Sequence, residues 1–326
     1  MAPDKPPIFR AVATSTRPLH QLLRCINFAP KVHVQITEEG IRFAADNSRA
    51  MQGVAFLDKA LFSAYSLNLP VNHHDDDDEP PELPIFQISL PSFLEVLQIF
   101  GAVDVAAKAQ KAEQDAYRSN LRNYRPDAFS NQVLGISGTC TLVYGEQGDA
   151  FKVTIEESGV KTTAGLTTYV PDLPEDIPFN REELAFKVIM PSRSLLDSLA
   201  EISPAAPDKL SIVASKTSPF LTLTGTGHLG SCAVDFARGR DLLETFTIAD
   251  RWCQTYKFDF IRNSTEAMRV ANKISLRGDA QGVLCLQFMV DMEGGKPSFL
   301  DFRFVPCIMS DDEDSDDGGN VDMDQE

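Results

Sequence analysis

The most restrictive feature of this sequence is an internal repeat, because a chain that repeats one unit has to pack similar units side by side. The segment TRPLHQLLRCI at residues 16–26 aligns with SRSLLDSLAEI at 192–202, and each directly follows a strand-like run. Two further junctions, at residues 90–92 and 258–262, also lead from a strand-like run into a helix-like one. We therefore predict four copies of a strand–helix–three-strand unit, paired into two halves of the chain.

Alternation of apolar and polar residues, typical of strands, dominates the chain. The strand-like runs are at residues 8–13, 32–36, 41–44, 54–57, 86–90, 139–144, 151–155, 160–168, 185–190, 210–214, 220–224, 232–236, 256–260, 273–277, 283–290 and 298–305. Helical periodicity is limited to residues 17–27, 91–100, 192–202 and 262–271. Because no helix regularly separates the strands, antiparallel meanders are favoured over a parallel sheet. The predicted fold class is α+β, with antiparallel sheets and two similar domains.

Turn-rich and low-complexity segments indicate how the chain is divided. We predict a first domain at residues 8–168, a proline-rich connector at 169–184 and a second domain at 185–306. Two insertions, at 68–84 and 105–132, interrupt the first domain. Residues 307–326 form an acidic tail that lacks the apolar surface needed to become ordered.

Charge is concentrated in two places rather than spread along the chain. The 326 residues include 30 Lys and Arg against 47 Asp and Glu, which gives a net charge of −17. Five acids lie at residues 75–79 and nine at 310–326, and without these fourteen acids the net charge is −3. A nearly neutral body is compatible with a basic face that meets nucleic acid.

Several classes of protein are excluded by what the sequence lacks. No apolar run approaches the roughly 18 residues of a membrane span, and the opening MAPDKPPIFR has no apolar signal-peptide core. The six cysteines are scattered without a CxxC motif, which favours a reduced, intracellular protein over a zinc site or a disulfide framework. We therefore expect no membrane association, no metal and no cofactor.

Three of the four helical segments have an apolar stripe on one side and arginine on the other. The basic positions opposite the stripes are Arg17, Arg24, Arg193, Arg262 and Arg269. For any one helix, an ordinary solvated face is the alternative interpretation. Recurrence at equivalent places of a repeat favours a shared surface that faces phosphates, with Lys31 and Lys273 near its rim. The segment 91–100 departs from this pattern, since it carries Glu95 and no basic residue.

Some motifs suggest chemistry but fit turns and loops better. Residues 225–230 match GxGxxG, yet a strand-like run follows where a dinucleotide site needs a helix, so a hairpin turn is expected. His73 and His74 lie in an acidic loop, and Asp291 and Glu293 lie in a glycine-rich hairpin tip, so neither pair makes a convincing metal cage. The sequence has no GxSxG, HExxH or phosphate-loop motif, and we predict no catalytic residue.

Two halves, each a doubled strand–helix–three-strand unit, resemble the DNA sliding-clamp fold typified by proliferating cell nuclear antigen. Three stretches look like one branch of that superfamily, the Rad-one-type subunit of the nine-one-one (9-1-1) checkpoint clamp. They are KVHVQITEEGIRFAADNSRAMQGVAF at 31–56, LPSFLEVLQIFG at 90–101 and GVLCLQFMV at 282–290. The resemblance covers residues 9–306 apart from the two insertions. It rests on the order of many moderate matches rather than on one diagnostic motif.

The resemblance implies a non-catalytic ring in the nucleus, made with two different sister clamp subunits. Such a ring encircles double-stranded DNA without reading its sequence, is opened and closed by an ATP-driven clamp loader, and recruits checkpoint activators and repair enzymes. The arginine-bearing helix faces agree with this, because a sliding ring needs attraction to phosphates without base readout. Two alternatives remain open from the residues: an acidic chaperone or scaffold for basic nuclear proteins, and a metal-dependent nuclease.

A two-domain subunit of a ring needs one unpaired strand at each end. By the order of the repeat, these edges are the strand-like runs at 160–168 and 232–236. The predicted interface residues are Val160, Lys161, Thr162 and Thr163 at one edge, and Cys232, Ala233, Val234, Asp235 and Phe236 at the other. The connector is the expected docking site for other partners, through Val170, Pro171, Leu173 and Ile177.

Overall fold

The computed structural model describes residues 6–69, 83–98, 139–157, 159–171, 176–237, 239, 242–292 and 296–308. Most of the predicted insertion at 68–84, all of that at 105–132 and the tail after Ile308 lie outside the described residues.

The structure contains the four predicted strand–helix–three-strand units. The first is β1 (Phe9–Ala13), α1 (Arg17–Leu23) with the 3-10 turn η1 (Arg24–Ile26), β2 (Lys31–Ile36), β3 (Gly40–Asn47) and β4 (Met51–Asp58). The second is β6 (Ile85–Ser89), α2 (Leu90–Gln98), β7 (Thr139–Tyr144), β8 (Phe151–Glu157) and β9 (Val160–Leu166). The third is β10 (Leu184–Pro191), α4 (Ser192–Ile202), β11 (Pro207–Ala214), β12 (Leu221–Gly227) and β13 (Gly230–Phe236). The fourth is β15 (Trp252–Lys257), α5 (Phe258–Arg262), α6 (Thr265–Val270), β16 (Lys273–Asp279), β17 (Leu284–Val290) and β18 (Ser298–Phe304).

Some short elements differ from the sequence prediction. The four-residue strands β5 (Ala64–Leu67) and β14 (Thr245–Ile248) and the 3-10 turns η2 (Lys59–Leu61) and η3 (Ser203–Ala205) were not predicted. The strand predicted at 256–260 is wrong after Lys257, because α5 begins at Phe258. The helix predicted at 262–271 starts too late and is not continuous, since α5 ends at Arg262 and α6 spans Thr265–Val270. The break is at Ser264, which is buried and donates its hydroxyl hydrogen bond back to the Ile261 carbonyl.

The strands form three antiparallel sheets, one of which joins the two halves of the chain. Its nine strands run β14-β10-β16-β17-β18-β4-β3-β2-β6, and the halves meet where β18 pairs with β4. We call this pairing the seam, in which Leu300 is opposite Ala55 and Phe304 is opposite Met51. The other two sheets are β5-β1-β7-β8-β9 in the first half and β13-β12-β11-β15 in the second. The predicted antiparallel α+β fold is thus confirmed.

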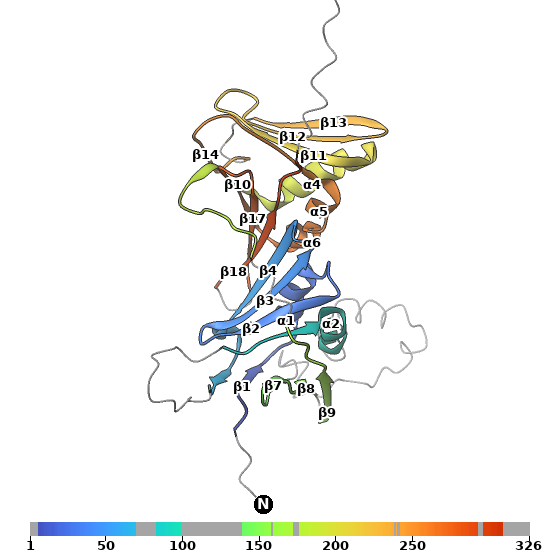
Figure 1. The fold of residues 1–326 in the computed structure, drawn as a ribbon, viewed down its shortest axis with the longest axis vertical. Helices are drawn as coiled ribbons and strands as arrows, with labels where there is room; N and C mark the ends of the chain where they lie inside the picture. Colours follow the sequence, from blue (N-terminus) through green and yellow to red (C-terminus); the bar gives the residue numbers. More distant parts are fainter. Residues whose placement is uncertain are drawn as a thin grey trace, which may run out of the picture.

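The helices form a layer on one side of the sheets, in the order α2, α1, α6 and α4 along the molecule (Figure 1). Their apolar stripes form the core against the sheets. Leu19, Leu22 and Ile26 are fully buried in the first unit, and Ile202 is fully buried and Leu195 nearly so in the third. Each fully buried side chain of this kind contributes about 1.5–3 kcal/mol relative to an exposed one. The helix faces opposite these stripes point away from the sheets.

The seam is closely packed because one of its residues has no side chain. Gly53 of β4 is opposite Phe302 of β18, and the ring of Phe28 lies over it. A Cβ at position 53 would be 2.7 Å from the Phe28 ring and 3.1 Å from the Phe302 ring. Glycine therefore lets aromatic side chains from both halves close over the seam.

Candidate functional site

The arginines predicted for one surface lie on the exposed side of the helix layer. Arg17 is the first residue of α1, Arg24 starts η1, Arg193 is in the first turn of α4, and Arg262 and Arg269 are at the ends of α5 and α6. All five are exposed, whereas the stripes on the opposite side of the same helices are buried. The structure therefore brings these five residues together on one layer.

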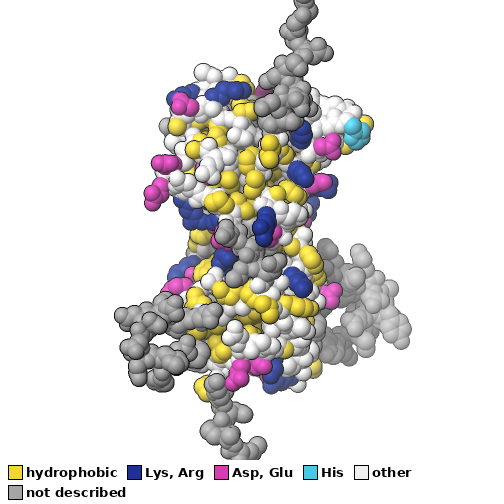
Figure 2. Space-filling model, viewed as in Figure 1, with side chains coloured by type: hydrophobic (Ala, Val, Ile, Leu, Met, Phe, Trp, Pro, Cys, Tyr) yellow, Lys and Arg dark blue, Asp and Glu magenta, His cyan; other side chains and the backbone are white. Residues whose placement is uncertain are grey.

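Four of these arginines have acidic partners on the same layer. Arg193 pairs with Asp197 at 2.8 Å and Arg262 with Asp259 at 2.9 Å, each within its own helix. Arg24 and Arg269 share one acid, Glu266 of α6, with Arg24 at 3.0 Å. The layer is therefore less positive than its arginines alone suggest. Figure 2 shows a comparable mixture on another face, where charges of both signs are interspersed without a large patch of either.

These acids are not among the residues predicted for the surface. Asp197 and Asp259 could have been found, because spacings of three or four residues along a helix place opposite charges side by side. Glu266 is also three residues from Arg269, so that pair was visible in the sequence. The pair between Arg24 and Glu266 was not, since 242 residues separate its partners.

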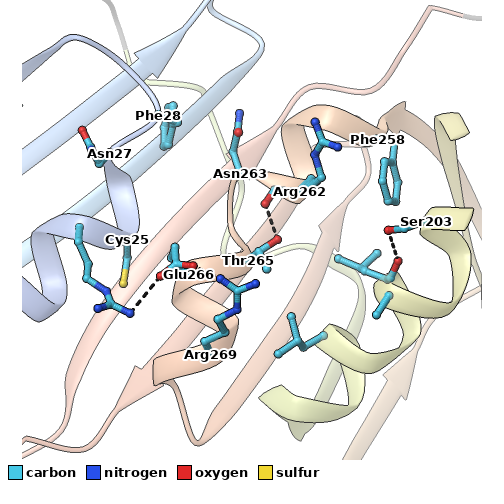
Figure 3. Close-up of a pocket in the computed structure, with 14 residues that line it drawn as sticks. Cys25, Asn27, Phe28, Ser203, Phe258, Arg262, Asn263, Thr265, Glu266 and Arg269 are labelled. Atoms are coloured by element: carbon cyan, nitrogen blue, oxygen red, sulfur yellow. Dashed lines mark hydrogen bonds and ion pairs between the residues drawn. The ribbon is translucent and has the colours of Figure 1, made fainter. Parts of the chain in front are cut away.

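A hollow of about 490 Å³ lies in the helix layer where the two halves meet. It is bordered by η1 from the first half and by α4, α5 and α6 from the second (Figure 3). Arg24, Arg262 and Arg269 contribute its positive charge and Glu266 its negative charge. Its apolar lining includes Phe28, Leu199 and Phe258. The hollow is thus a concave, arginine-bearing site on the helix layer.

The two lysines predicted near the rim are not on the arginine surface. In β2 the residues that face the helices are Val32, Val34 and Ile36, so the preceding Lys31 points to the opposite side of the sheet. Its ammonium lies 3.7 Å from the centre of the Tyr169 ring, a cation–π contact. Lys273 occupies the same position in β16 and pairs with Glu244 at 2.7 Å. Strand alternation sets both directions, and it is the sequence signal from which they could have been predicted.

The two strands predicted as free edges are both end strands of their sheets. β9 ends the five-stranded sheet of the first half, and β13 ends the four-stranded sheet of the second. Burial on the side that faces the helix layer is uneven along both strands. Leu166 and Phe236 are buried there, whereas Val160 of β9 is 54% exposed and Cys232 of β13 contacts the Glu201 carbonyl of α4. Both strands therefore have an unpaired backbone edge in the described chain.

The two described parts of the connector are each held against the nine-stranded sheet. At the first end, Tyr169 forms a β-bridge with Gln87, while the neighbouring Val170 is 89% exposed. At the second end, Arg303 donates a 2.6 Å hydrogen bond to the carbonyl of Ile177, whose side chain is buried. Of the predicted docking residues, Val170 and Pro171 are thus accessible and Ile177 is covered, and Leu173 lies outside the described residues.

Asp176 anchors the second end of the connector. Its two carboxylate oxygens each accept a 2.8 Å hydrogen bond from Arg42, and one also accepts a bond from Gln52 at 2.9 Å. Partial burial alone would raise the pKa of the Asp176 carboxyl, but the Arg42 guanidinium and these hydrogen bonds outweigh burial and hold the pKa below its usual range.

The motifs that fit turns and loops better than chemistry form no metal or nucleotide site among the described residues. Residues 225–230 make the turn between β12 and β13, as predicted, and not a helix start. Asp291 accepts a hydrogen bond from Asn272 at 2.5 Å, and His73, His74 and Glu293 lie outside the described residues. In the described part of the chain, no three His, Cys, Asp or Glu side chains are grouped as metal ligands. Nor does any described helix have the length and apolarity to cross a membrane.

A sheet shared by two similar halves, a helix layer that carries arginine, and one open strand at each end define the DNA-clamp class of protein. Among solved structures, PCNA from Thermococcus kodakaraensis matches with a TM-score of 0.64 at 17% identity, over 92% of this chain and 100% of that one. The PCNA2–PCNA3 complex from Sulfolobus tokodaii matches with the same TM-score at 15% identity, over 91% of this chain and 98% of that one. The clamp fold expected from the resemblance is confirmed.

The family model described as "Repair protein Rad1/Rec1/Rad17" matches residues 8–290, and the chain belongs to this family. The DNA damage checkpoint control protein rad1 of Schizosaccharomyces pombe is 29% identical over 310 residues, which cover 94% of this chain and 89% of that protein. The cell cycle checkpoint protein RAD1 of Mus musculus is 25% identical, over 90% of each chain. The branch of the clamp superfamily expected from the sequence is therefore correct.

Proposed function

We propose that this protein is a non-catalytic subunit of a DNA damage checkpoint clamp, a closed ring made with two different sister chains that encircles double-stranded DNA. The observation that carries the proposal is the seam, where the last strands of two repeat units pair with each other within one chain. In the repeat, β9 is the counterpart of β18 and β13 is the counterpart of β4. The two strand edges left open, at opposite ends of the molecule, thus correspond to the two that the seam joins.

The correspondence extends to register. β17 pairs its first residue with Phe304, the last residue of β18, and β8 pairs its first residue with Leu166, the last residue of β9. Repeating the seam between chains would bury the half-exposed side chains of β9 and β13 as the seam buries Phe302. Because β9 and β13 are different surfaces, such a contact is head-to-tail and closes into a ring or continues as a filament.

Closure of the ring would place the helix layer inside it, as the sheets form the outer wall. Arg17, Arg24, Arg193, Arg262 and Arg269 would then face the DNA backbone. Each arginine can donate hydrogen bonds to phosphate oxygens. The described helix faces present no element that could enter a groove and read bases. Double-stranded DNA of any sequence is the ligand that this surface suits.

Partners outside the ring would meet the outer wall and the connector. Val170, which is exposed, and Pro171, which is partly exposed, are the accessible described residues of the proposed docking site for repair enzymes and checkpoint activators. Loading of a closed ring onto DNA would require a clamp loader to open one interface. A ring that works on chromosomal DNA is expected in the nucleus.

The test is to co-express the chain with two candidate sister clamp subunits and load the purified assembly onto nicked circular DNA. We expect the mass of one copy of each of the three chains, and we expect the ring to stay on circular DNA and leave when the circle is cut. Changing Arg17, Arg193 and Arg262 together to Glu should leave the mass unchanged and reduce retention. The slope of log binding constant against log salt concentration should also become shallower, by roughly 0.9 for each lost phosphate contact.

A chain that forms a stable ring alone would contradict the heterotrimer. Retention of the triple Arg→Glu variant at the wild-type level would contradict the DNA-facing assignment.

A further inference from the structure

Glu266 differs from the other acids paired with arginine on the described helix layer. Asp197 and Asp259 each pair with an arginine of their own helix. Glu266 of α6 binds Arg269 on the same helix and also Arg24, which is on η1 in the other half of the chain. One oxygen of its carboxylate faces each guanidinium, Oε2 to Arg24 and Oε1 to Arg269. A single carboxylate thus holds two arginines across the junction of the halves.

The same three side chains border the arginine-bearing hollow described above (Figure 3). A phosphate group offers guanidinium groups the same arrangement as a carboxylate, with two or more anionic oxygens that accept charge-assisted hydrogen bonds. The position between Arg24 and Arg269 is therefore already an anion site, and Glu266 fills it. Arg262, on the rim of the same hollow, supplies further positive charge.

We propose that this hollow is a phosphate-binding site for the DNA backbone, and that Glu266 occupies it as an internal counter-anion when DNA is absent. The inference rests on the proposed function, since it assigns a ligand to one place on the DNA-facing layer. When a backbone phosphate enters, its oxygens take the hydrogen bonds of Arg24 and Arg269, and the Glu266 carboxylate turns to solvent. Each phosphate contact then requires an existing ion pair to be broken, which lowers the affinity of the ring for DNA.

A low affinity is useful to a ring that is held on DNA by its closed shape, because tight phosphate contacts would stop it from sliding. The exposure of the group agrees with this role. The side chains of Arg24, Glu266 and Arg269 are 43%, 38% and 57% exposed, so phosphate can reach them and they can rearrange without unpacking the core. Exposed ion pairs of this kind add little to stability, so a brace between the halves is a poor explanation for Glu266.

The experiment compares three-chain rings that carry Glu266→Gln, Asp250→Asn or neither change, with binding to a linear duplex measured from 50 to 300 mM salt. Asp250 pairs with Lys216 away from the hollow, so its variant makes the same change in net charge. We expect Glu266→Gln to bind several-fold more tightly at low salt and to steepen the log–log salt slope by about 1–2, because two arginines become free for phosphate. Asp250→Asn should match the wild type.

A second measurement ties the effect to the two arginines. In a ring that already carries Arg24→Gln and Arg269→Gln, adding Glu266→Gln should change neither affinity nor slope. The inference is overturned if Glu266→Gln behaves like Asp250→Asn, if it binds more weakly than the wild type, or if its gain persists without the two arginines. Glu266→Ala provides a second variant with the same expectation. Absence of DNA binding by the wild-type ring would instead overturn the proposed function itself.

Discussion

At the scale of single residues, charged side chains form exposed ion pairs on the helix side of the sheet and a more enclosed anchor for the connector on its outer side. On the helix side, ion pairs such as that of Arg193 with Asp197 are exposed and exchangeable. On the outer side, Asp176 accepts hydrogen bonds from Arg42 and Gln52 and thereby fixes one end of the connector. Gln52 is 1% exposed and Arg42 is partly covered, so this group is more enclosed than the arginine pairs. Removal of the Asp176 charge should therefore loosen the connector.

We predict that Asp176→Asn lowers the free energy of unfolding by about 0.5–1 kcal/mol, a small value because the side chain is 48% exposed. The pKa of Asp176 is lowered in the folded protein. Its contribution is therefore complete above the unfolded pKa of about 3.9 and is lost only as pH falls through the lower folded value. Urea unfolding from pH 5 to 8 should show a constant difference between variant and wild type.

Asp250→Asn is the matched control, since the pair of Asp250 with Lys216 is on the surface and holds no connector. It should leave the free energy of unfolding within about 0.3 kcal/mol of the wild type. A difference for Asp176→Asn that shrinks between pH 8 and 5, or that equals the control, would show that Asp176 does not anchor the connector through its charge.

At the scale of elements, the open edges of β9 and β13 are the features from which a prediction follows most directly. A proline in a strand removes a backbone donor. We predict that Thr163→Pro in β9 abolishes binding to one sister subunit and that Val234→Pro in β13 abolishes binding to the other. Each variant should keep the remaining partner in a pull-down and should remain folded by circular dichroism, because end strands are paired on one side within the chain.

The control for the edge variants is Thr247→Pro in β14, which is also an end strand and is not a counterpart of the strands at the seam. It should leave both partners bound. If Thr163→Pro or Val234→Pro still binds both sisters, that strand is not a subunit interface.

The elements that the sequence predicted well are those in which local pattern and tertiary packing agree. The stripe of Leu195, Leu199 and Ile202 on α4 is periodic over eleven residues, and the structure buries it. β5 and β14 could not be found in this way, because each has four residues and a weak burial pattern, and only pairing with β1 or β10 makes it a strand. The side-chain directions of Lys31 and Lys273 could have been predicted from strand alternation. The contact of Arg24 with Glu266 could not, because it depends on how the two halves pack.

At the scale of the whole molecule, one pairing pattern appears at two levels. The seam joins the halves of the chain through β18 and β4, and the proposed ring joins chains through the counterparts of these strands. The helix layer contains acids as well as arginines, and the body without the acidic loop and tail has a net charge of only −3. Attraction between the ring and DNA is therefore modest, so the charges of the acidic loop and tail have a large effect on the affinity for DNA.

The acidic tail gives the prediction at this scale. Truncation after Ile308 removes nine of the 47 acidic residues and no basic one, while every described strand and helix is kept. We expect unchanged thermal unfolding and unchanged assembly with the sister subunits. Without the tail's repulsion, the ring should bind linear DNA ends and the outside of duplexes more strongly at low salt. The difference should fade by about 150 mM salt, where the Debye length is near 8 Å. Gel-shift titrations on linear and circular DNA, at low salt and at about 150 mM salt, measure this difference.

A tail variant in which all nine acids are changed to Asn or Gln should behave like the truncation, since charge and not length is the cause. A truncated chain that fails to assemble, or a neutral tail that still suppresses binding to linear DNA, would contradict this account.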